Sequence, residues 1–266
     1  MDRSLKNPPM THNEFVKDQF NRQAIEFDNW SVTKNLEYLK AISEFISFKP
    51  DDTLLDVATG TGDFPLFVAP QIKHAVGIDI SDKMIDMAKI KTAKRAITNV
   101  EFRVSDVEQV PFPDNCFSAV SSKSAFHHMP EYKRVFKEMA RCCQTGGKVA
   151  VCDIVAFEDR DVDGFFERFE QCVDASHFKT LSRNEFTGLF NSHGISLEKS
   201  FEVEIEHTVA EYLGHAVQTE ENLLELDNLL SRARDITCLG DYWTFGKDNQ
   251  DTKFRKKVIL LLGRKS

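Results

Sequence analysis

Hydrophobic residues in the middle of the chain form short runs that alternate with segments of helical periodicity. The apolar runs predict five strands, at Thr53–Val57, Ala75–Ile80, Val100–Val104, Phe117–Ser121 and Lys148–Val155. Helical spacing recurs between them, from Asp63 to Ala69, after Ser81, and from Glu131 to Cys142, with Gly146 and Gly147 as the stop signal of the last helix. This alternation predicts an α/β fold with a doubly wound, mostly parallel sheet.

Both ends of the chain depart from this alternation. Helical periodicity extends from Thr11 to Phe48, up to a turn at Lys49–Asp52. After residue 156 the pattern predicts helices at Asp161–Val173 and Ser182–Ser192, one or two helices over Val209–Leu230, and strands at Ser196–Ile205 and Lys257–Leu262. We therefore expect an N-terminal helical cap of residues 1–48 and a core of residues 49–266, with helical insertions at about 156–181 and 208–240.

Composition and charge narrow the class of protein. A length of 266 residues allows one large domain or one domain with a cap. The net charge of −8 argues against nucleic-acid binding, and no apolar run approaches the roughly 18–20 residues of a membrane span. The six cysteines have no metal-ligand spacing and the N-terminus has no secretory pattern, so we expect a cytoplasmic protein with reduced thiols and no metal site.

The most informative segment is LLDVATGTGD, residues 54–63, which leads from an apolar strand into a helix. Gly60 and Gly62 allow a sharp turn and the close approach of a ligand to the backbone. Asp79 ends the next strand, 19 residues after Gly60, at the spacing of a carboxylate that binds ribose hydroxyl groups. The pattern predicts a nucleotide-type cofactor site, with a plain tight turn as the alternative.

Three positions distinguish between nucleotide cofactors. Pro65 stands where a dinucleotide fingerprint has its third glycine. Asp56 would repel a pyrophosphate but suits a cationic or amino-bearing ligand, and S-adenosylmethionine carries a sulfonium and an ammonium group without phosphate. Asp106 follows the third strand and can accept a hydrogen bond from an adenine amino group, unless it is only a cap or turn residue. The residues favour S-adenosylmethionine over NAD.

These segments together resemble the class I S-adenosylmethionine-dependent methyltransferases, within them the small-molecule branch related to ubiquinone and menaquinone biosynthesis. The matching stretches include LLDVATGTGD, VGIDIS at 76–81, NVEFRVSDVEQVPFPDNCFSAV at 99–120 and AFHHMP at 125–130. The resemblance implies a Rossmann-like sheet of seven strands with the last strand antiparallel. It also implies cofactor contacts from Asp56, Ala58, Thr59, Gly60, Gly62, Asp79, Ile80, Met84, Asp106, Val107 and Ser122.

The chain departs from this branch at several positions. Ala58 replaces the first glycine of the usual turn. Two stretches typical of the quinone enzymes are replaced by Phe27–Trp30 (FDNW) and Cys152–Ile154 (CDI), which argues against quinone methylation. Methyltransferases of this group without an assigned substrate carry a Ser-His pair, matched here by Ser176 and His177. We expect an enzyme that methylates a small-molecule acceptor and releases S-adenosylhomocysteine, as a monomer or a homodimer.

Methyl transfer from a sulfonium is an in-line displacement, so the protein mainly aligns donor and acceptor. An acceptor that must lose a proton also needs a base. The candidate catalytic residues are His127 and His128 after the fourth strand, His177 in the insertion, and Asp153 at the end of the fifth strand, with packing or capping as the alternative for the histidines. Two other functions remain open at this point, a nicotinamide-dependent oxidoreductase and a non-catalytic S-adenosylmethionine-binding protein.

Overall fold

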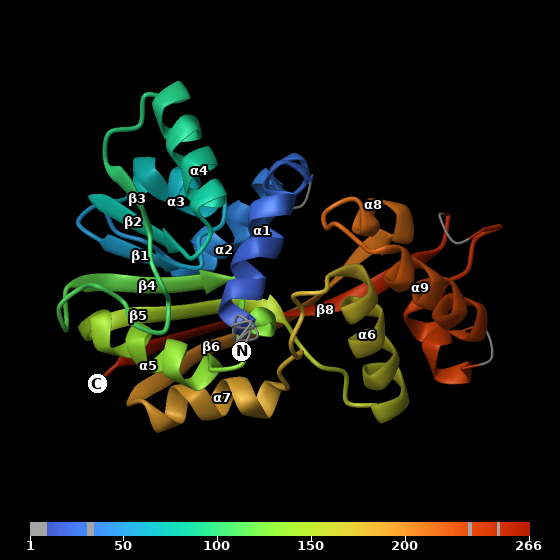
Figure 1. Cartoon of the computed structure of the whole chain (residues 1–266). Helices are drawn as coiled ribbons and strands as arrows, with labels where there is room; N and C mark the ends of the chain where they lie inside the picture. Colours follow the sequence, from blue (N-terminus) through green and yellow to red (C-terminus); the bar gives the residue numbers. More distant parts are fainter. Residues whose placement is uncertain (1–9, 31–34, 234–235, 249–250) are drawn as a thin grey trace, which may run out of the picture.

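The computed structural model describes residues 10–30, 35–233, 236–248 and 251–266. Its strands are β1 (Thr53–Val57), β2 (His74–Asp79), β3 (Val100–Val104), β4 (Phe117–Lys123), β5 (Cys143–Ile154), β6 (Ile195–Thr208), β7 (Trp243–Thr244) and β8 (Lys253–Lys265). They form one sheet in the order β3-β2-β1-β4-β5-β8-β6, and the short β7 also pairs with β8 (Figure 1). Strands β1 to β5 are parallel, and β8 lies antiparallel between β5 and β6. The predicted α/β fold with its last strand antiparallel is confirmed.

The α-helices are α1 (His12–Asn29), α2 (Leu36–Ile46), α3 (Asp63–Val68), α4 (Asp82–Lys94), α5 (Tyr132–Cys142), α6 (Arg160–Val173), α7 (Arg183–Ser192), α8 (Val209–Leu213) and α9 (Glu220–Ala233). Short 3-10 turns are η1 (Ala69–Gln71), η2 (Phe126–His128) and η3 (Thr237–Asp241). The hydroxyl group of Ser81 accepts a hydrogen bond from the backbone of Met84, so Ser81 caps α4 as predicted.

The predicted stop signal at Gly146 and Gly147 was wrong. Helix α5 passes directly into β5 at Cys143, and both glycines lie inside that strand. A Cβ atom at Gly147 would lie 2.9 Å from the carbonyl oxygen of Ser118. Gly147 therefore serves the close approach of two strands rather than the end of a helix.

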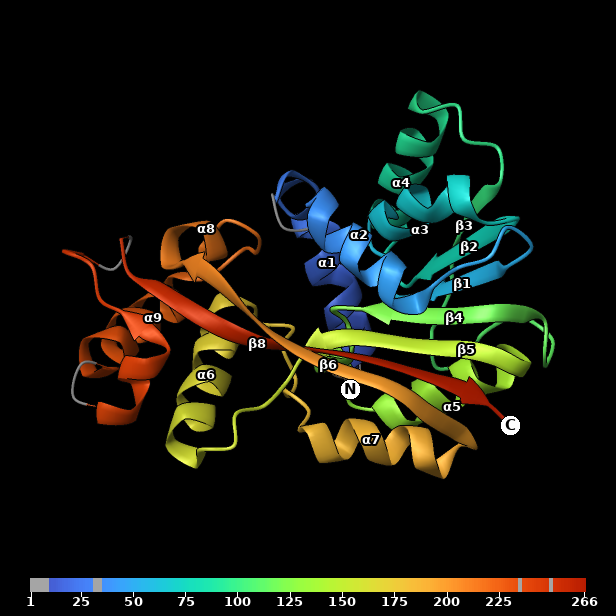
Figure 2. The same ribbon diagram turned by 180° about the vertical axis from the view of Figure 1, so that it is seen from behind.

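Side chains on β1 alternate between two apolar layers. Leu55 and Val57 pack on the side covered by α5 and α7. Leu54 packs on the side covered by α2, α3 and α4. Helices therefore cover both faces of the sheet (Figures 1 and 2), which leaves the carboxyl ends of the parallel strands as the open edge where ligands bind in such folds.

The two N-terminal helices occupy different places. Helix α2 buries Leu39, Ile42 and Ile46 against one face of the sheet. Helix α1 instead lies next to the carboxyl ends of the parallel strands (Figure 1). Residues 1–9 and 31–34 of the predicted cap lie outside the described residues. The division at residue 48 stays a prediction, and within it only α1 has the position of a cap.

A second group of helices surrounds one end of the long strands β6 and β8. Helices α6, α8 and α9 gather there, away from β1 to β3 (Figures 1 and 2). Their shared core is rich in aromatic residues and includes Phe165, Phe166, Phe169, Trp243 and Phe254. In the described part of the chain, no helix has both the length and the apolar character of a membrane span.

Candidate functional site

A cavity lies at the carboxyl ends of β1, β2 and β3, and its volume is about 960 Å³ when the part open to solvent is included. Nine of the eleven predicted cofactor residues line it, namely Asp56, Ala58, Thr59, Gly60, Asp79, Ile80, Met84, Asp106 and Val107. Val16, Phe20 and Phe27 of α1 also line it. The first cavity is therefore built from the segments at the ends of β1, β2, β3 and β4 and from helix α1.

Asp56 is a buried carboxylate in this cavity. Its Oδ1 atom accepts a hydrogen bond of 2.6 Å from the hydroxyl group of Ser121, and its Oδ2 atom accepts one of 2.7 Å from Thr59. Burial raises the pKa of Asp56 to about 6, against the effect of these two hydrogen bonds. A buried carboxylate held by neutral hydroxyl groups is suited to a cationic ligand.

Asp79 joins two of the turns that form the cavity. Its Oδ2 atom accepts a hydrogen bond of 2.8 Å from the backbone of Gly60, and its Oδ1 atom accepts one of 2.9 Å from the backbone of Ser81. Burial raises the pKa of Asp79, although the backbone amide groups oppose this change. The carboxylate therefore has a fixed orientation at the cavity wall before any ligand binds.

The two remaining predicted cofactor residues, Gly62 and Ser122, do not line this cavity. Gly62 has a φ of 76°, and an added Cβ atom would lie 2.4 Å from the ring of Phe102, so it is a packing position. Ser122 faces the opposite side of β4 from Ser121, because side chains alternate along a strand. Its hydroxyl group is buried and has no hydrogen-bond partner in the described part of the chain.

A second cavity adjoins the first, and its volume is about 770 Å³ when the part open to solvent is included. Both are lined by Phe20, Phe27, Lys123, Ser124 and His128. The second cavity extends toward the α6–α8 region, and five histidines line it, His127, His128, His177, His207 and His215.

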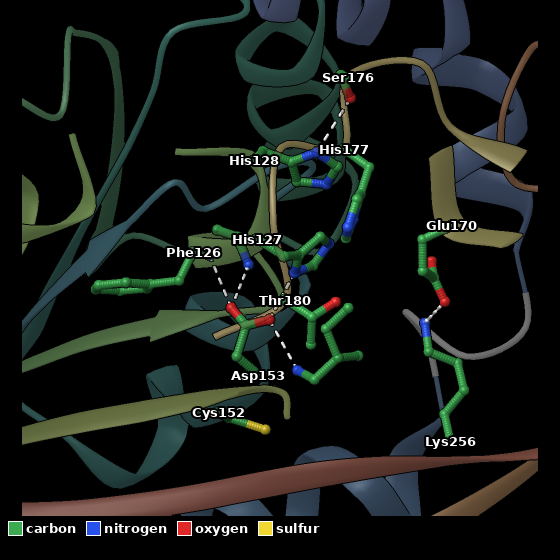
Figure 3. Close-up of polar contacts among 12 residues, drawn as sticks. Phe126, His127, His128, Cys152, Asp153, Glu170, Ser176, His177, Thr180 and Lys256 are labelled. Carbon is green, nitrogen blue, oxygen red and sulfur yellow. Dashed lines mark hydrogen bonds and ion pairs between the residues drawn. The ribbon is translucent and has the colours of Figure 1, made fainter. Parts of the chain in front are cut away.

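His127 and Asp153 form a hydrogen-bonded pair beside this cavity. The distance from His127 Nδ1 to Asp153 Oδ1 is 2.5 Å, and Asp153 also accepts hydrogen bonds from the backbone of Ala125, Phe126 and Ile154 (Figure 3). Burial alone would raise the pKa of Asp153, but His127 and the amide groups hold it below its ordinary value. Asp153 lines neither cavity, so the structure gives it the position of a residue that orients His127.

His128 lies where the two cavities meet. Its Nδ1 atom is 3.1 Å from the hydroxyl oxygen of Ser176, and that hydroxyl group donates a hydrogen bond of 2.6 Å to Asp174 (Figure 3). Burial, with a smaller effect of the neighbouring His127, lowers the pKa of His128 to about 3. The imidazole of His128 is therefore uncharged at neutral pH.

His177 completes a group of three imidazole rings. The ring centroids of His127 and His128 are 4.1 Å apart, and that of His177 lies 5.7 and 6.5 Å from them (Figure 3). His177 Nε2 is 3.0 Å from Glu167, whereas its buried Nδ1 atom has no hydrogen-bond partner among the described residues. The structure thus brings all four predicted catalytic residues together. No group of His, Cys, Asp or Glu in the described ranges is arranged to hold a metal ion.

Polar residues that were not predicted from the sequence lie at the other end of the second cavity. Lys256 Nζ is 2.6 Å from Glu170 Oε1, and the hydroxyl group of Tyr212 donates a hydrogen bond of 2.8 Å to Glu170. Burial would raise the pKa of Glu170, but Lys256 and nearby groups lower it to about 2. These residues come from α6, α8 and β8, so no local motif could have indicated them.

Comparison with known proteins agrees with this geometry. Residues 55–151 match the sequence model of a methyltransferase domain. An uncharacterized methyltransferase of Bacillus subtilis, YcgJ, is 23% identical over 92% of this chain and 97% of its own length. The solved structure of YcgJ has a TM-score of 0.78 over 86% of this chain and 98% of its own. A demethylmenaquinone methyltransferase of Listeria monocytogenes is 27% identical, and this match spans 54% of the chain and 63% of the relative.

Proposed function

The chain belongs to the class I S-adenosylmethionine-dependent methyltransferases, and from this premise we propose that it methylates a small-molecule acceptor bound in the second cavity. One observation carries the proposal. Two cavities adjoin each other, and the first contains the residues expected to hold the cofactor. A donor in the first cavity and an acceptor in the second would meet beside Lys123, Ser124 and His128.

The first cavity has the chemistry that S-adenosylmethionine requires. The carboxylate of Asp56 suits an ammonium group, and that of Asp79 suits ribose hydroxyl groups. Ile80, Met84 and Val107 supply apolar walls for an adenine ring. When bound, the cofactor supplies a methyl group already activated by a sulfonium sulfur.

The contribution of the chain is alignment and the exclusion of water. Helix α1 is held beside both cavities by a contact of 2.9 Å from the ring of His12 to the carbonyl oxygen of His128. At its middle, Asn21 accepts a hydrogen bond of 2.7 Å from Ser81. Phe20 and Phe27 of this helix line both cavities. Well-oriented reactants can gain roughly 7–11 kcal/mol of the barrier from such positioning.

Within this proposal the three histidines remain the candidate catalytic residues, and Asp153 orients one of them. His128 lines both cavities, whereas His127 and His177 line only the second. This difference supports His128 as the group nearest to the transferred methyl carbon.

The first test is calorimetric titration with S-adenosylmethionine, S-adenosylhomocysteine and NADH. We expect binding of the first two ligands and loss of binding in Asp79→Ala, with Asp86→Ala as the matched control because Asp86 is exposed on α4. Binding of NADH alone would refute the proposal in favour of an oxidoreductase. Binding of S-adenosylmethionine without turnover of any acceptor would favour a non-catalytic binding protein.

A further inference from the structure

We propose that His128 is the general base of the reaction, that Ser176 and Asp174 position it, and that the acceptor reacts through a hydroxyl group on an aromatic ring. This inference rests on the proposed function and deepens it. It follows from the hydrogen bonds that determine where the proton of His128 lies, and from the groups that face the second cavity.

The hydrogen bonds around Ser176 assign the tautomer of His128. Asp174 accepts hydrogen bonds from the backbone (2.8 Å) and the hydroxyl group (2.6 Å) of Ser176, and from the side chain of Gln23 (3.3 Å). An ionised carboxylate only accepts hydrogen bonds, so the single hydroxyl proton of Ser176 is directed to Asp174. The oxygen of Ser176 must then accept the proton on His128 Nδ1, 3.1 Å away. The lone pair of the imidazole is left on Nε2.

His128 Nε2 is available to a ligand. No hydrogen bond from the described residues reaches this atom, and the residue lines both cavities. The groups that face His128 are His127 on the same turn, His177 and Asp174 after α6, His12 on α1, and Lys123 on β4. Because burial keeps the pKa of His128 low, the ring carries no charge that would oppose a sulfonium in the adjoining cavity.

A weak, uncharged base suits one class of acceptor in particular. As an acceptor oxygen forms its bond to the methyl carbon, the carbon–sulfur bond breaks and its electron pair remains on sulfur. The hydroxyl proton becomes strongly acidic at that stage and moves to His128 Nε2, and it passes later to solvent. The imidazolium formed is stabilised through Ser176 by the negative charge of Asp174. A thiolate has no proton to lose, and a neutral amine is nucleophilic enough to attack before its proton leaves, so neither depends on a base in this way.

Two further observations concern the body of the acceptor. Aromatic rings from three helices line the second cavity, among them Phe20 and Phe27 of α1, Tyr38 of α2 and Tyr212 of α8. Flat aromatic faces pack well against a planar ring. The buried Nδ1 atom of His177, which has no protein partner among the described residues, is a hydrogen-bond acceptor beside the same cavity. An acceptor with hydroxyl groups on an aromatic ring would pack against these rings and donate a hydrogen bond to His177 Nδ1.

The first test measures the tautomer and needs no turnover. In protein labelled with 15N at histidine, we expect His128 to carry its proton on Nδ1 between pH 5 and pH 8, a range that lies above its pKa of about 3. In Ser176→Ala the proton of His128 should be distributed over both ring nitrogens, whereas Ser176→Thr should keep it on Nδ1. Ser192→Ala is the matched control, because the hydroxyl group of Ser192 contacts only His193 among the histidines. A wild-type His128 with its proton on Nε2 would overturn the proposal.

The second test compares three acceptors with one ring system, 2-naphthol, 2-naphthylamine and 2-naphthalenethiol, using S-adenosylmethionine with a radiolabelled methyl group. We expect transfer to 2-naphthol, and a fall in kcat of about 10²–10⁴-fold in His128→Gln. Ser176→Ala should lower kcat with little change in KM, and it provides a second test if His128→Gln does not fold. Methyl transfer to the thiol, which is ionised at pH 8, should be much less affected by these substitutions. His193→Gln is the control and should behave as wild type.

The outcomes separate this inference from the proposed function. Failure to bind S-adenosylmethionine would refute the proposed function itself. Binding of S-adenosylmethionine without transfer to 2-naphthol would overturn the inference about the acceptor, whether or not the amine or the thiol is methylated. Equal losses in His128→Gln for 2-naphthol and for the thiol would overturn the role of His128 as a base.

Discussion

The two cavities share a wall but are assembled from the chain in different ways. The first is formed by residues 56–64, 79–84, 106–108 and 123–129, at the ends of four consecutive strands, together with helix α1. The second combines residues from α1, the ends of β4 and β5, the segment after α6, and β6, α8 and β8. Local motifs describe the first cavity because each turn forms next to its strand. The second exists only after the complete sheet has formed.

The carboxylates of the two cavities also differ in charge balance. Burial raises the pKa of Asp56 and Asp79 in the first cavity, where hydroxyl and amide groups are their partners. In the second cavity, Glu170 and Asp174 have lowered pKa values despite their burial, because cationic or hydrogen-bonding neighbours stabilise the charge. A cationic ligand would therefore stabilise the ionised carboxylates of the first cavity, whose hydrogen-bond partners are neutral, whereas the charges of the second cavity are nearly balanced and suit an uncharged molecule.

The largest expected effect is on stability, at the buried ion pair of the second cavity. Lys256→Met leaves Glu170 buried without its cation, and we expect a loss of about 3–5 kcal/mol in the free energy of unfolding, measured with urea. Adding Glu170→Gln should recover part of the loss because no charge then remains buried. Lys253→Met is the control, since Lys253 and its partner Glu206 are exposed, and it should have little effect.

A somewhat smaller loss is expected at the glycine turn of the first cavity. Gly62→Ala combines a left-handed backbone with a Cβ atom 2.4 Å from the ring of Phe102, so unfolding should become easier by about 2–4 kcal/mol. Gly146→Ala separates the two causes, because Gly146 has a φ of 75° and nothing within 4 Å of the added atom. Gly146→Ala should lower the free energy of unfolding by only about 1–2 kcal/mol. Equal losses in the two variants would contradict the role of Phe102.

The next effect is on cofactor affinity and should be confined to the first cavity. Asp79→Asn loses a charged acceptor of hydrogen bonds, which corresponds to about 1.5–3 kcal/mol and a fall of about 10- to 100-fold in affinity for S-adenosylmethionine. Glu170→Gln in the second cavity should leave this affinity unchanged in calorimetry. Equal losses in both variants would mean that the two cavities do not bind different ligands.

The smallest effect is a dependence of cofactor affinity on pH. The ammonium group of S-adenosylmethionine favours ionised Asp56, and this ionised form is lost as the pH falls through its pKa of about 6. Affinity should therefore fall about tenfold between pH 7 and pH 5. Asp56→Asn should bind more weakly at pH 7 and lose this dependence. A wild-type affinity that is constant over this range would exclude Asp56 as the partner of the ammonium group.

The sequence pattern predicted the fold most accurately where the structure is local. The bounds of β1 and β3 agree with the predicted Thr53–Val57 and Val100–Val104. Within the region from Thr11 to Phe48 that was predicted as helical, the described residues form α1 and α2, but periodicity alone could not show that α2 packs on a face of the sheet whereas α1 lies at the strand ends. Periodicity reports which side of a helix is apolar, and not which partner it packs against.

The same limit explains the candidate site. His127, His128, His177 and Asp153 were identified from their places after strands or within the insertion, and the structure brings them together. The importance of Asp174 and Lys256 depends on contacts with residues distant in the chain, and neither lies in a recognisable motif. Ser122 was assigned from a resemblance, but strand alternation turns it away from the cavity.

The position of β8 has a consequence for how the protein is made on the ribosome. All residues of the first cavity precede β5 in the chain, whereas β8 lies between β5 and β6 and carries Lys256. Until residues 253–265 emerge during translation, the edge of β5 therefore has no neighbouring strand. Glu170 has no ion-pair partner over the same period, because Lys256 has not yet been made. A nascent chain of this protein would complete the proposed cofactor cavity before the proposed acceptor cavity, and in that interval the open edge of β5 could bind chaperones.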